Sequence, residues 1–319
     1  METKILNLLK EKKDNFISGQ ELSGKLNVSR TAVWKHIKNL RNYGYGISAV
    51  THMGYRLDSV PDKMLPDEIS YGLKTKVLAR KIFAYSCVDS TNDIAYRLAE
   101  DSQPEGSLII AEQQSKGKGR MGRSWVSPAG SGIYMSLILR PRIPIDHIGK
   151  MTLMTAVAVA KTIRDITGLG AMIKWPNDIY INGLKVCGIL TQISAEPDLI
   201  NFVIIGIGVN INTSRHKLPD VATSLFLESG KKIIRVEFLQ KMLAEIEAYY
   251  TKLNKNAFLS IIKDWTLYSM TIGRRIKVDH RSDIIEGQAM EIDESGALII
   301  RDDVGFMHRI LSGDVNIIR

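Results

Sequence analysis

The chain has 319 residues, of which 45% are hydrophobic and 24% charged, a composition typical of two or three folded domains rather than of a disordered chain. Its two cysteines are too few for a disulfide framework, and its first residues lack the pattern of a signal peptide. The most apolar helical run, residues 151–160, is too short to cross a bilayer, so we expect a cytoplasmic protein without membrane association.

Much of the formal net charge of +9 lies near the N-terminus. Residues 1–60 contain seven Lys and three Arg against three Glu and two Asp, a net charge of +5. An excess of positive charge on a small domain is expected for a protein that binds a polyanion, although it is also compatible with solubility alone.

Residues 1–43 have the pattern of three short helices. Apolar residues at positions 5, 6, 8 and 9 predict the first helix, and Ser18 with Glu21 forms a capping box that begins the second. After a turn at 27–29, Ser29 caps a third helix over 30–43, whose buried stripe is Val33, Ile37 and Leu40. The opposite face of this helix is basic, polar and aromatic.

The second and third helices resemble a helix-turn-helix, in which the second helix of the pair enters the major groove of DNA. Residues 47–50 and 55–57 predict a β-hairpin at the position of a wing. We therefore predict a winged-helix DNA-binding domain over residues 1–60. Its candidate DNA contacts are Ser29, Arg30, Thr31, Trp34, Lys35 and Lys38. The alternative is a helical protein-interaction domain with a solvated basic face.

Residues 58–66 contain two prolines and predict a linker to a second domain, residues 61–270. A strand is expected at 81–85, and the Asp89–Asn92 turn caps a helix that ends near Glu100. Apolar runs at 107–111 and 133–139 predict two buried strands on either side of a polar loop.

That loop, residues 112–125, combines glycines with cations. Gly117, Gly119 and Gly122 disfavour helix and strand, and they allow backbone N–H groups to approach a ligand. The interleaved cations are suited to phosphate or carboxylate oxygens; they are Lys116, Lys118, Arg120 and Arg123. The loop matches neither the Walker nor the Rossmann pattern, so a merely solvated basic loop is the competing interpretation.

A long buried helix is expected at 147–167, followed by a hairpin. Asn182-Gly183 between alternating apolar residues predicts a tight type I′ turn, which places Asp178 and Lys185 on facing strands. Such charged residues on apolar strands need a partner or a ligand unless the lysine lies at a solvated edge. A further strand at 199–208 ends in Gly206 and Gly208, which indicates either close approach of another group or a packing bulge.

These motifs together resemble the biotin protein ligases, and with the N-terminal domain they resemble bifunctional biotin operon repressors that are also ligases. The resemblance rests on 89–92, on 114 with 117–125, on 174–178 with Lys185, and on 206–210. It implies an α+β chain with three parts: a winged helix-turn-helix, a central mixed α/β ligase domain, and an SH3-like small β-barrel over residues 271–319. The alternating strands expected at 275–278, 284–292, 297–301, 306–311 and 315–317 agree with this last domain.

The resemblance also implies roles for individual residues. Biotin would be bound by Ser90, Thr91, Asn92, Gln114, Lys118, Gly119, Arg120 and Lys185, and the adenylate by Gly117, Arg123, Trp125, Asn177 and Asn210. The catalytic residues would be Lys185, Arg120 and Asp178, with no protein-bound metal site. Lys118 stands where the family commonly has arginine, so this position keeps the positive charge but not the bidentate geometry.

The expected substrates are biotin and ATP, the latter with Mg²⁺, and the expected acceptor is a lysine of a biotin carboxyl carrier protein. Loaded with biotinyl-5′-AMP, the chain would form a homodimer and bind the biotin operator. Two alternatives remain from the sequence: a DNA-binding sensor without ligase turnover, and a lipoate-type ligase on the same scaffold. The C-terminal domain would help to bind ATP or the acceptor, or would serve as a structural cap.

Overall fold

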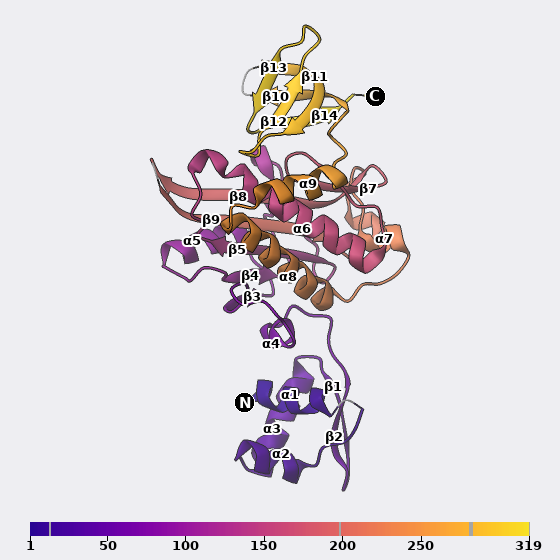
Figure 1. Cartoon of the computed structure of the whole chain (residues 1–319). Helices are drawn as coiled ribbons and strands as arrows, with labels where there is room; N and C mark the ends of the chain where they lie inside the picture. Colours follow the sequence, from indigo (N-terminus) through magenta and orange to yellow (C-terminus); the bar gives the residue numbers. More distant parts are fainter. Residues whose placement is uncertain (13, 198, 281–282, 319) are drawn as a thin grey trace. The chain divides into compact units, whose positions relative to one another are not determined.

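The computed structural model describes residues 1–12, 14–197, 199–280 and 283–318. The chain divides into two compact units, Met1–Lys63 and Met64–Arg319 (Figure 1). Each unit has its own buried core, and each is described by itself below. No helix among the residues described has both the length and the apolar character needed to cross a membrane.

The first unit consists of three helices and one hairpin. Ser18 and Ser29 cap the second and third helices, because their hydroxyl oxygens accept from the backbone N–H groups of Glu21 (3.0 Å) and Ala32 (3.1 Å). The predicted caps and the winged helix-turn-helix are therefore confirmed. The elements are α1 (Glu2–Glu11), α2 (Gly19–Leu26), α3 (Arg30–Asn42), β1 (Gly46–Val50) and β2 (Gly54–Ser59).

The second unit is built on a seven-stranded mixed sheet of order β3-β4-β5-β9-β8-β7-β6. β3 and β4 are parallel, and the other neighbours are antiparallel. The strands are β3 (Ile82–Tyr85), β4 (Leu108–Ala111), β5 (Gly132–Leu139), β6 (Met172–Lys174), β7 (Asp178–Ile181), β8 (Leu184–Glu196) and β9 (Leu199–Asn210).

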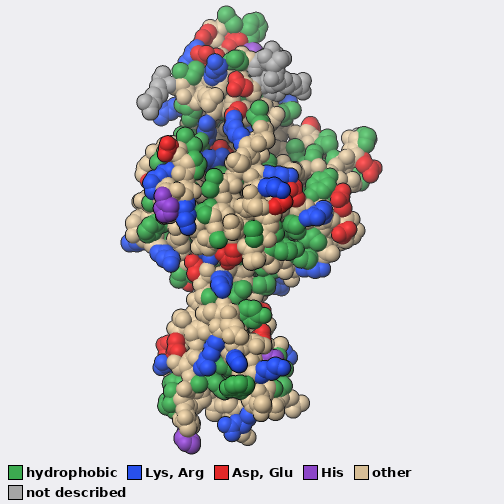
Figure 2. Space-filling view, turned by 180° about the vertical axis from the view of Figure 1, so that it is seen from behind, with side chains coloured by type: hydrophobic (Ala, Val, Ile, Leu, Met, Phe, Trp, Pro, Cys, Tyr) green, Lys and Arg blue, Asp and Glu red, His purple; other side chains and the backbone are tan. Residues whose placement is uncertain are grey.

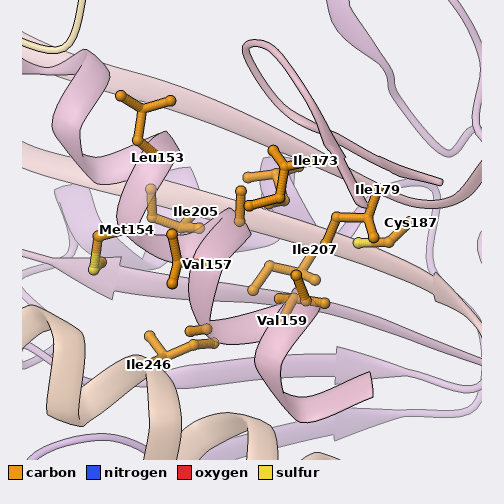
Figure 3. Close-up of a cluster of buried hydrophobic side chains, with 14 of the residues drawn as sticks. Leu153, Met154, Val157, Val159, Ile173, Ile179, Cys187, Ile205, Ile207 and Ile246 are labelled. Atoms are coloured by element: carbon orange, nitrogen blue, oxygen red, sulfur yellow. The ribbon is translucent and has the colours of Figure 1, made fainter. Parts of the chain in front are cut away.

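Both faces of this sheet are covered, because successive strand residues point to opposite sides. On one side, residues such as Ile205 and Ile207 pack in the main core with α6 and α8 (Figure 3). On the other side, Ile204 and Phe202 pack against α5. α6 is buried over most of its surface, as its evenly spread apolar residues predict. The helices are α4 (Pro66–Ser70), α5 (Thr91–Glu100), α6 (Gly149–Thr167), α7 (Leu225–Ser229), α8 (Arg235–Asn254) and α9 (Phe258–Tyr268).

The C-terminal residues form a five-stranded antiparallel sheet of order β13-β12-β11-β10-β14. All five strands expected from the alternation are present: β10 (Arg275–His280), β11 (Asp283–Ile292), β12 (Leu298–Arg301), β13 (Met307–Ile310) and β14 (Asp314–Ile317). Together with the helix-turn-helix and the mixed sheet, this confirms the α+β fold class.

Three features of the second unit differ from the sequence analysis. The strand expected to end at the paired glycines continues through them to Asn210, because both neighbouring strands hydrogen-bond to it along that length. The helices α8 and α9 were not predicted. The short edge strand β6 was also missed, since it has only three residues and is followed by the cis Trp175-Pro176 bond.

Candidate functional site

A patch of glycine backbone forms the floor of the site. Along β9, the residues that face α5 are Phe202 and Ile204, then Gly206 and Gly208. Gly188 of β8 lies directly opposite Gly208. Strand β9 therefore has large side chains under α5 and none at the two positions on this face beyond the N-terminus of α5. We call Gly188, Gly206 and Gly208 the glycine floor.

Side chains from other elements occupy the space that these glycines leave. A Cβ atom at Gly206 would overlap the amide of Asn92, and one at Gly208 would overlap the indole of Trp125. Asn92 and Trp125 therefore approach the backbone of Gly206 and Gly208 closely, which is one of the two interpretations of the paired glycines. The glycine floor is required by packing and is not a bulge.

The N-terminus of α5 supplies a buried polar cluster at one end of the floor. The Ser136 hydroxyl of β5 lies within hydrogen-bond distance of Asn92 Oδ1 (2.7 Å) and Thr91 Oγ1 (2.8 Å). Gln114 Oε1 accepts from the backbone N–H of Thr91 (2.8 Å), and Asn92 Nδ2 donates to Gln192 Oε1 (2.8 Å). Because these groups are fixed by one another, they are pre-organised to recognise a polar ligand.

The predicted hairpin lies at the other end of the floor. Asn182 and Gly183 both have positive φ (50° and 81°), as a type I′ turn requires. Lys185 Nζ lies 2.7 Å from Asp178 Oδ2, so the expectation that these residues face each other is confirmed.

A β-bulge makes this ion pair geometrically feasible. The register shifts between Ile179 and Tyr180, so that Asp178 lies opposite Gly188 instead of Cys187. Lys185 Cε and Nζ lie within 3.4 Å of where a Cβ of Gly188 would be. The lysine side chain therefore runs over a glycine to reach Asp178. Its ammonium group also lies 5.5 Å from the centre of the Trp125 ring.

Carboxylates hold the glycine-rich loop at three points. Lys116 pairs with Asp89 (3.1 Å), Lys118 pairs with Asp93 (2.6 Å), and Arg123 pairs with Asp314. All three cations are substantially exposed, and ion pairs of this kind contribute little to stability. The loop is thus held by contacts that an anionic ligand can replace.

Arg120 differs from the other cations of the loop. Its Nη1 donates to Asn177 Oδ1 (3.0 Å), and burial lowers the pKa of its guanidinium while Asp178 and Asp314 act in the opposite direction. Among the residues described, this partly desolvated guanidinium has an amide oxygen as its hydrogen-bond acceptor, so it is available for a stronger anionic partner.

The polar cluster, the hairpin and the loop line one cavity of about 110 Å³. Typical small-molecule sites have volumes of about 300–1,000 Å³, so this cavity is small for a site of that kind. The predicted residues that line this cavity are Ser90, Thr91, Asn92, Gln114, Lys118, Gly119, Arg120, Arg123, Trp125, Asn177, Asp178 and Lys185.

Two predicted residues do not line the cavity. Gly117 lies inside the loop, where its carbonyl accepts from the Trp125 N–H (2.8 Å) and a Cβ would overlap the Trp125 carbonyl. Asn210 is buried beside the cavity, and its Nδ2 donates to the Thr223 carbonyl (3.0 Å). The structure therefore gives Gly117 a role in loop shape and Asn210 a role in holding the segment that contains Thr223.

Sequence reasoning missed Ser136 and Asp314, which lie outside the recognised motifs, and Gly188, which follows Lys185 on β8. It also missed the segment 215–223, which pairs with the hairpin: the Lys185 N–H donates to the Val221 carbonyl (3.0 Å). Arg215 Nη1 holds this segment through the Ala222 carbonyl (2.6 Å).

Several polar atoms of the site have no hydrogen-bond partner among the described residues. They are Trp125 Nε1, Asp178 Oδ1 and Asn210 Oδ1, all buried. Buried polar atoms are normally paired, and unpaired ones often belong to a binding site. Over the described part of the chain, no group of three or more His, Cys, Asp or Glu side chains is arranged to hold a metal ion.

The candidate DNA-binding residues lie together on α3. Ser29, Arg30, Thr31, Trp34, Lys35 and Lys38 are all exposed. Trp34 remains 54% exposed, and Lys38 Nζ lies 5.6 Å from the centre of its ring. A groove between α3 and the β1–β2 turn is lined by Arg30, Thr31 and Trp34. In Figure 2, Lys and Arg side chains surround apolar ones on the visible face of this unit. These basic, polar and aromatic side chains are therefore suited to contact the phosphate backbone of DNA and the base edges in a groove.

Three segments of the chain match known domain families. Residues 2–56 match a helix-turn-helix (HTH) domain, residues 84–210 match the Biotin/lipoate A/B protein ligase family, and residues 271–317 match the Biotin protein ligase C-terminal domain. A ligase-type site and a helix-turn-helix in one chain define a class of proteins that combine a ligase with a DNA-binding domain.

Individual proteins match over nearly the whole length. The chain is 41% identical to the bifunctional ligase/repressor BirA of Bacillus subtilis over 98% of this chain and 97% of that protein. It is 27% identical to BirA of Escherichia coli over 95% of this chain and 93% of that protein. The chain belongs to the family of bifunctional ligase/repressors.

A solved structure agrees with this assignment. The biotin protein ligase from Aquifex aeolicus in complex with biotin and ATP superimposes with a TM-score of 0.65 and 29% identity. The match covers 75% of this chain and 99% of that protein.

Proposed function

We propose that the chain joins biotin to a lysine of a biotin carboxyl carrier protein in two ATP-dependent steps, and that its N-terminal unit represses biotin genes. The observation that carries the ligase proposal is the convergence of Arg120 and Lys185 with the polar N-terminus of α5 on one cavity. This arrangement combines a recognition end with a charge-stabilising end.

In the first step, a carboxylate oxygen of biotin attacks the α-phosphorus of ATP and pyrophosphate leaves. Negative charge builds up on the five-coordinate phosphorus, so cations fixed at that point stabilise the transition state more than the substrates. Lys185 is already positioned by Asp178, and Arg120 is held only by Asn177. Arg120 can therefore turn to the phosphate without loss of a charge pair, and Lys185 stays oriented by Asp178.

In the second step, a lysine amine attacks the acyl carbon, the bond to phosphate breaks, and AMP leaves. The Oδ1 atom of Asp178, which has no partner among the described residues, is suited to accept a hydrogen bond from the amine. The mixed anhydride hydrolyses readily in water, so a closed loop also protects it.

The remaining residues divide between the two ends of the adenylate. Ser90, Thr91, Asn92, Gln114, Lys118 and Gly119 would hold biotin. Arg123, Trp125 and Asn177 would contact the nucleotide, with Gly117 and Asn210 acting through the loop and the segment 215–223.

Mg²⁺ would accompany ATP. It usually takes one or two protein carboxylates together with phosphate and water oxygens, and Asp178 and Asp314 are the carboxylates that line the cavity. Bound there, it would neutralise charge on the triphosphate.

For regulation, we propose that biotinyl-5′-AMP orders the loop and favours a homodimer. A homodimer has two α3 helices and should bind the operator more tightly than a monomer does. Once one helix is bound, binding of the second half-site is intramolecular. Such a protein would act in the cytoplasm.

Biotin-dependent exchange of labelled pyrophosphate into ATP tests the first step. We expect the Lys185→Ala variant to lose about 100-fold or more in rate, the magnitude typical of one removed charge-stabilising group. Lys252→Ala, a partly exposed lysine on α8, is the matched control and should retain full activity. Exchange with lipoate but not with biotin would refute the proposal.

Operator binding tests the regulatory half. A gel shift on the biotin operator should strengthen when biotin and ATP are added together, and it should not strengthen with either alone. Equal affinity under all conditions would contradict a corepressor role for the adenylate.

A further inference from the structure

A second cavity, of about 360 Å³, adjoins the first. It lies between the start of α6, the Trp175-Pro176 segment, β8 and the turns of the C-terminal sheet. Arg120, Asn177 and Ile189 line both cavities. The 3.0 Å hydrogen bond from Arg120 Nη1 to Asn177 Oδ1 therefore joins two side chains of the wall that separates them.

The second cavity is mostly apolar. Ile148, Leu153, Pro176 and Ile193 contribute to its walls, and the partly exposed carboxylate of Asp146 lies at its rim. Trp175 also lines it, and the buried indole N–H of this residue has no acceptor among the described residues. The site thus offers an apolar channel and an acidic rim.

This chemistry fits an extended cationic side chain better than a nucleotide. A lysine has an apolar four-carbon stem and a cationic end, which match apolar walls and an acidic rim. Phosphates would be repelled by Asp146, and Arg120 is the single cation among the residues that line the cavity.

We propose that the second cavity admits the acceptor lysine and its turn, and that Arg120 controls its passage to the acyl group. The proposal rests on the proposed ligase function, which requires a third reactant to reach the first cavity. While Arg120 is bound to Asn177, the wall is closed. When Arg120 turns to the phosphate of the adenylate, this hydrogen bond is lost and the wall opens. The acceptor is then admitted only after the first step.

The Ile193→Trp variant tests this inference by filling the channel. Ile193 lies on β8, is 36% exposed, and lines the second cavity but not the first. We expect unchanged pyrophosphate exchange and a kcat/KM for the carrier protein reduced about tenfold or more. Transfer to hydroxylamine, a nucleophile small enough to avoid the channel, should be unchanged. Leu259→Trp, at a 65% exposed position of α9, is the matched control.

The outcomes are distinct. Normal transfer to the carrier by Ile193→Trp would overturn the inference and leave the ligase function intact. Loss of exchange by this variant would also overturn it, because the cavity would then belong to the nucleotide. Absence of exchange in the unaltered chain would overturn the proposed function, and the inference with it.

A second variant tests the acidic rim without changing the volume of the channel. Asp146→Asn should raise the KM for the carrier protein. The rate at which this variant transfers biotin to hydroxylamine should be unchanged. An unchanged KM for the carrier would contradict electrostatic guidance of the lysine by this rim.

Discussion

At the scale of single residues, the absence of side chains at the glycine floor is a functional property. A methyl group at Gly206 would overlap the Asn92 amide, which is itself fixed by Ser136 and Gln192. We expect Gly206→Ala to lose biotin affinity and to destabilise the fold by about 1–3 kcal/mol, the usual cost of overpacking. Calorimetric titration with biotin and urea unfolding measure the two effects.

Gly170→Ala is the control for this substitution. No atom lies within 4 Å of a Cβ placed there, so the change should be neutral. If Gly206→Ala binds biotin as tightly as the unaltered chain, the polar cluster does not form the biotin end of the site.

The ion pair between Arg123 and Asp314 predicts a pH dependence. The hydrogen bond from Arg123 holds the pKa of the Asp314 carboxyl below its ordinary value of 3.8. A lowered folded-state pKa contributes stability that is present above the unfolded pKa and is lost as pH falls through the folded one. The stability difference between the unaltered chain and Arg123→Gln should therefore be modest and constant above about pH 4, and it should decline as pH falls through the lowered pKa of Asp314.

Urea midpoints of both proteins between pH 3 and 6 measure this difference. A difference that persists unchanged at pH 3 would show that Arg123 stabilises the chain through contacts other than the carboxylate.

Local contacts of the site were predictable from the sequence, and distant ones were not. The hairpin turn predicts that Asp178 and Lys185 lie on facing strands, and the bulge that sets the register between them was not predictable. Arg123 and Asp314 are 191 residues apart and meet only because the C-terminal sheet packs beside the loop. No periodicity or spacing connects them.

At the scale of elements, α8 connects the helical layer to the glycine-rich loop. Its first residue, Arg235, is fully buried and donates to Glu112 Oε2 (2.8 Å) and to the Gly132 carbonyl (3.2 Å). These acceptors lie at the beginning and the end of the loop region. Glu112 Oε1 also accepts from the Met64 N–H (2.6 Å), at the start of the second unit.

We expect Arg235→Ala to destabilise the chain by about 3–5 kcal/mol, because it leaves the Glu112 carboxylate without its buried partner. The double variant Arg235→Met/Glu112→Gln, which removes both charges, should be less destabilised. Thermal unfolding of the two variants makes the comparison. Equal losses would show that the packing of α8, not the ion pair, supports the loop.

The helix itself has a sequence signal that the motif search passed over. Phe238, Leu239, Met242, Leu243 and Ile246 follow helical spacing and are all buried. The bulge opposite Ile179 has no such signal, since it depends on how two strands pair.

At the scale of the whole molecule, the division after Lys63 predicts separable activities. Each unit has its own core, so residues 64–319 alone should fold and should retain biotin-dependent pyrophosphate exchange. They should not bind the operator, because the exposed basic face of α3 is removed. Exchange and gel-shift assays on the truncated chain test both statements, and operator binding by it would refute the assignment of α3.

The order of the three parts was predictable because each has its own local pattern: caps and turns in the first, interrupted apolar strands in the second, regular alternation in the third. The strand order of the large sheet was not, because β9 inserts between β5 and β8 and brings residues from distant motifs together.

The glycine floor has a consequence for inhibition. The Asn92 amide and the Trp125 indole cover Gly206 and Gly208, so an inhibitor of this site would contact those two side chains. A resistance substitution at either glycine must add a side chain, and that side chain would overlap Asn92 or Trp125. Few resistance substitutions would therefore be tolerated at those positions.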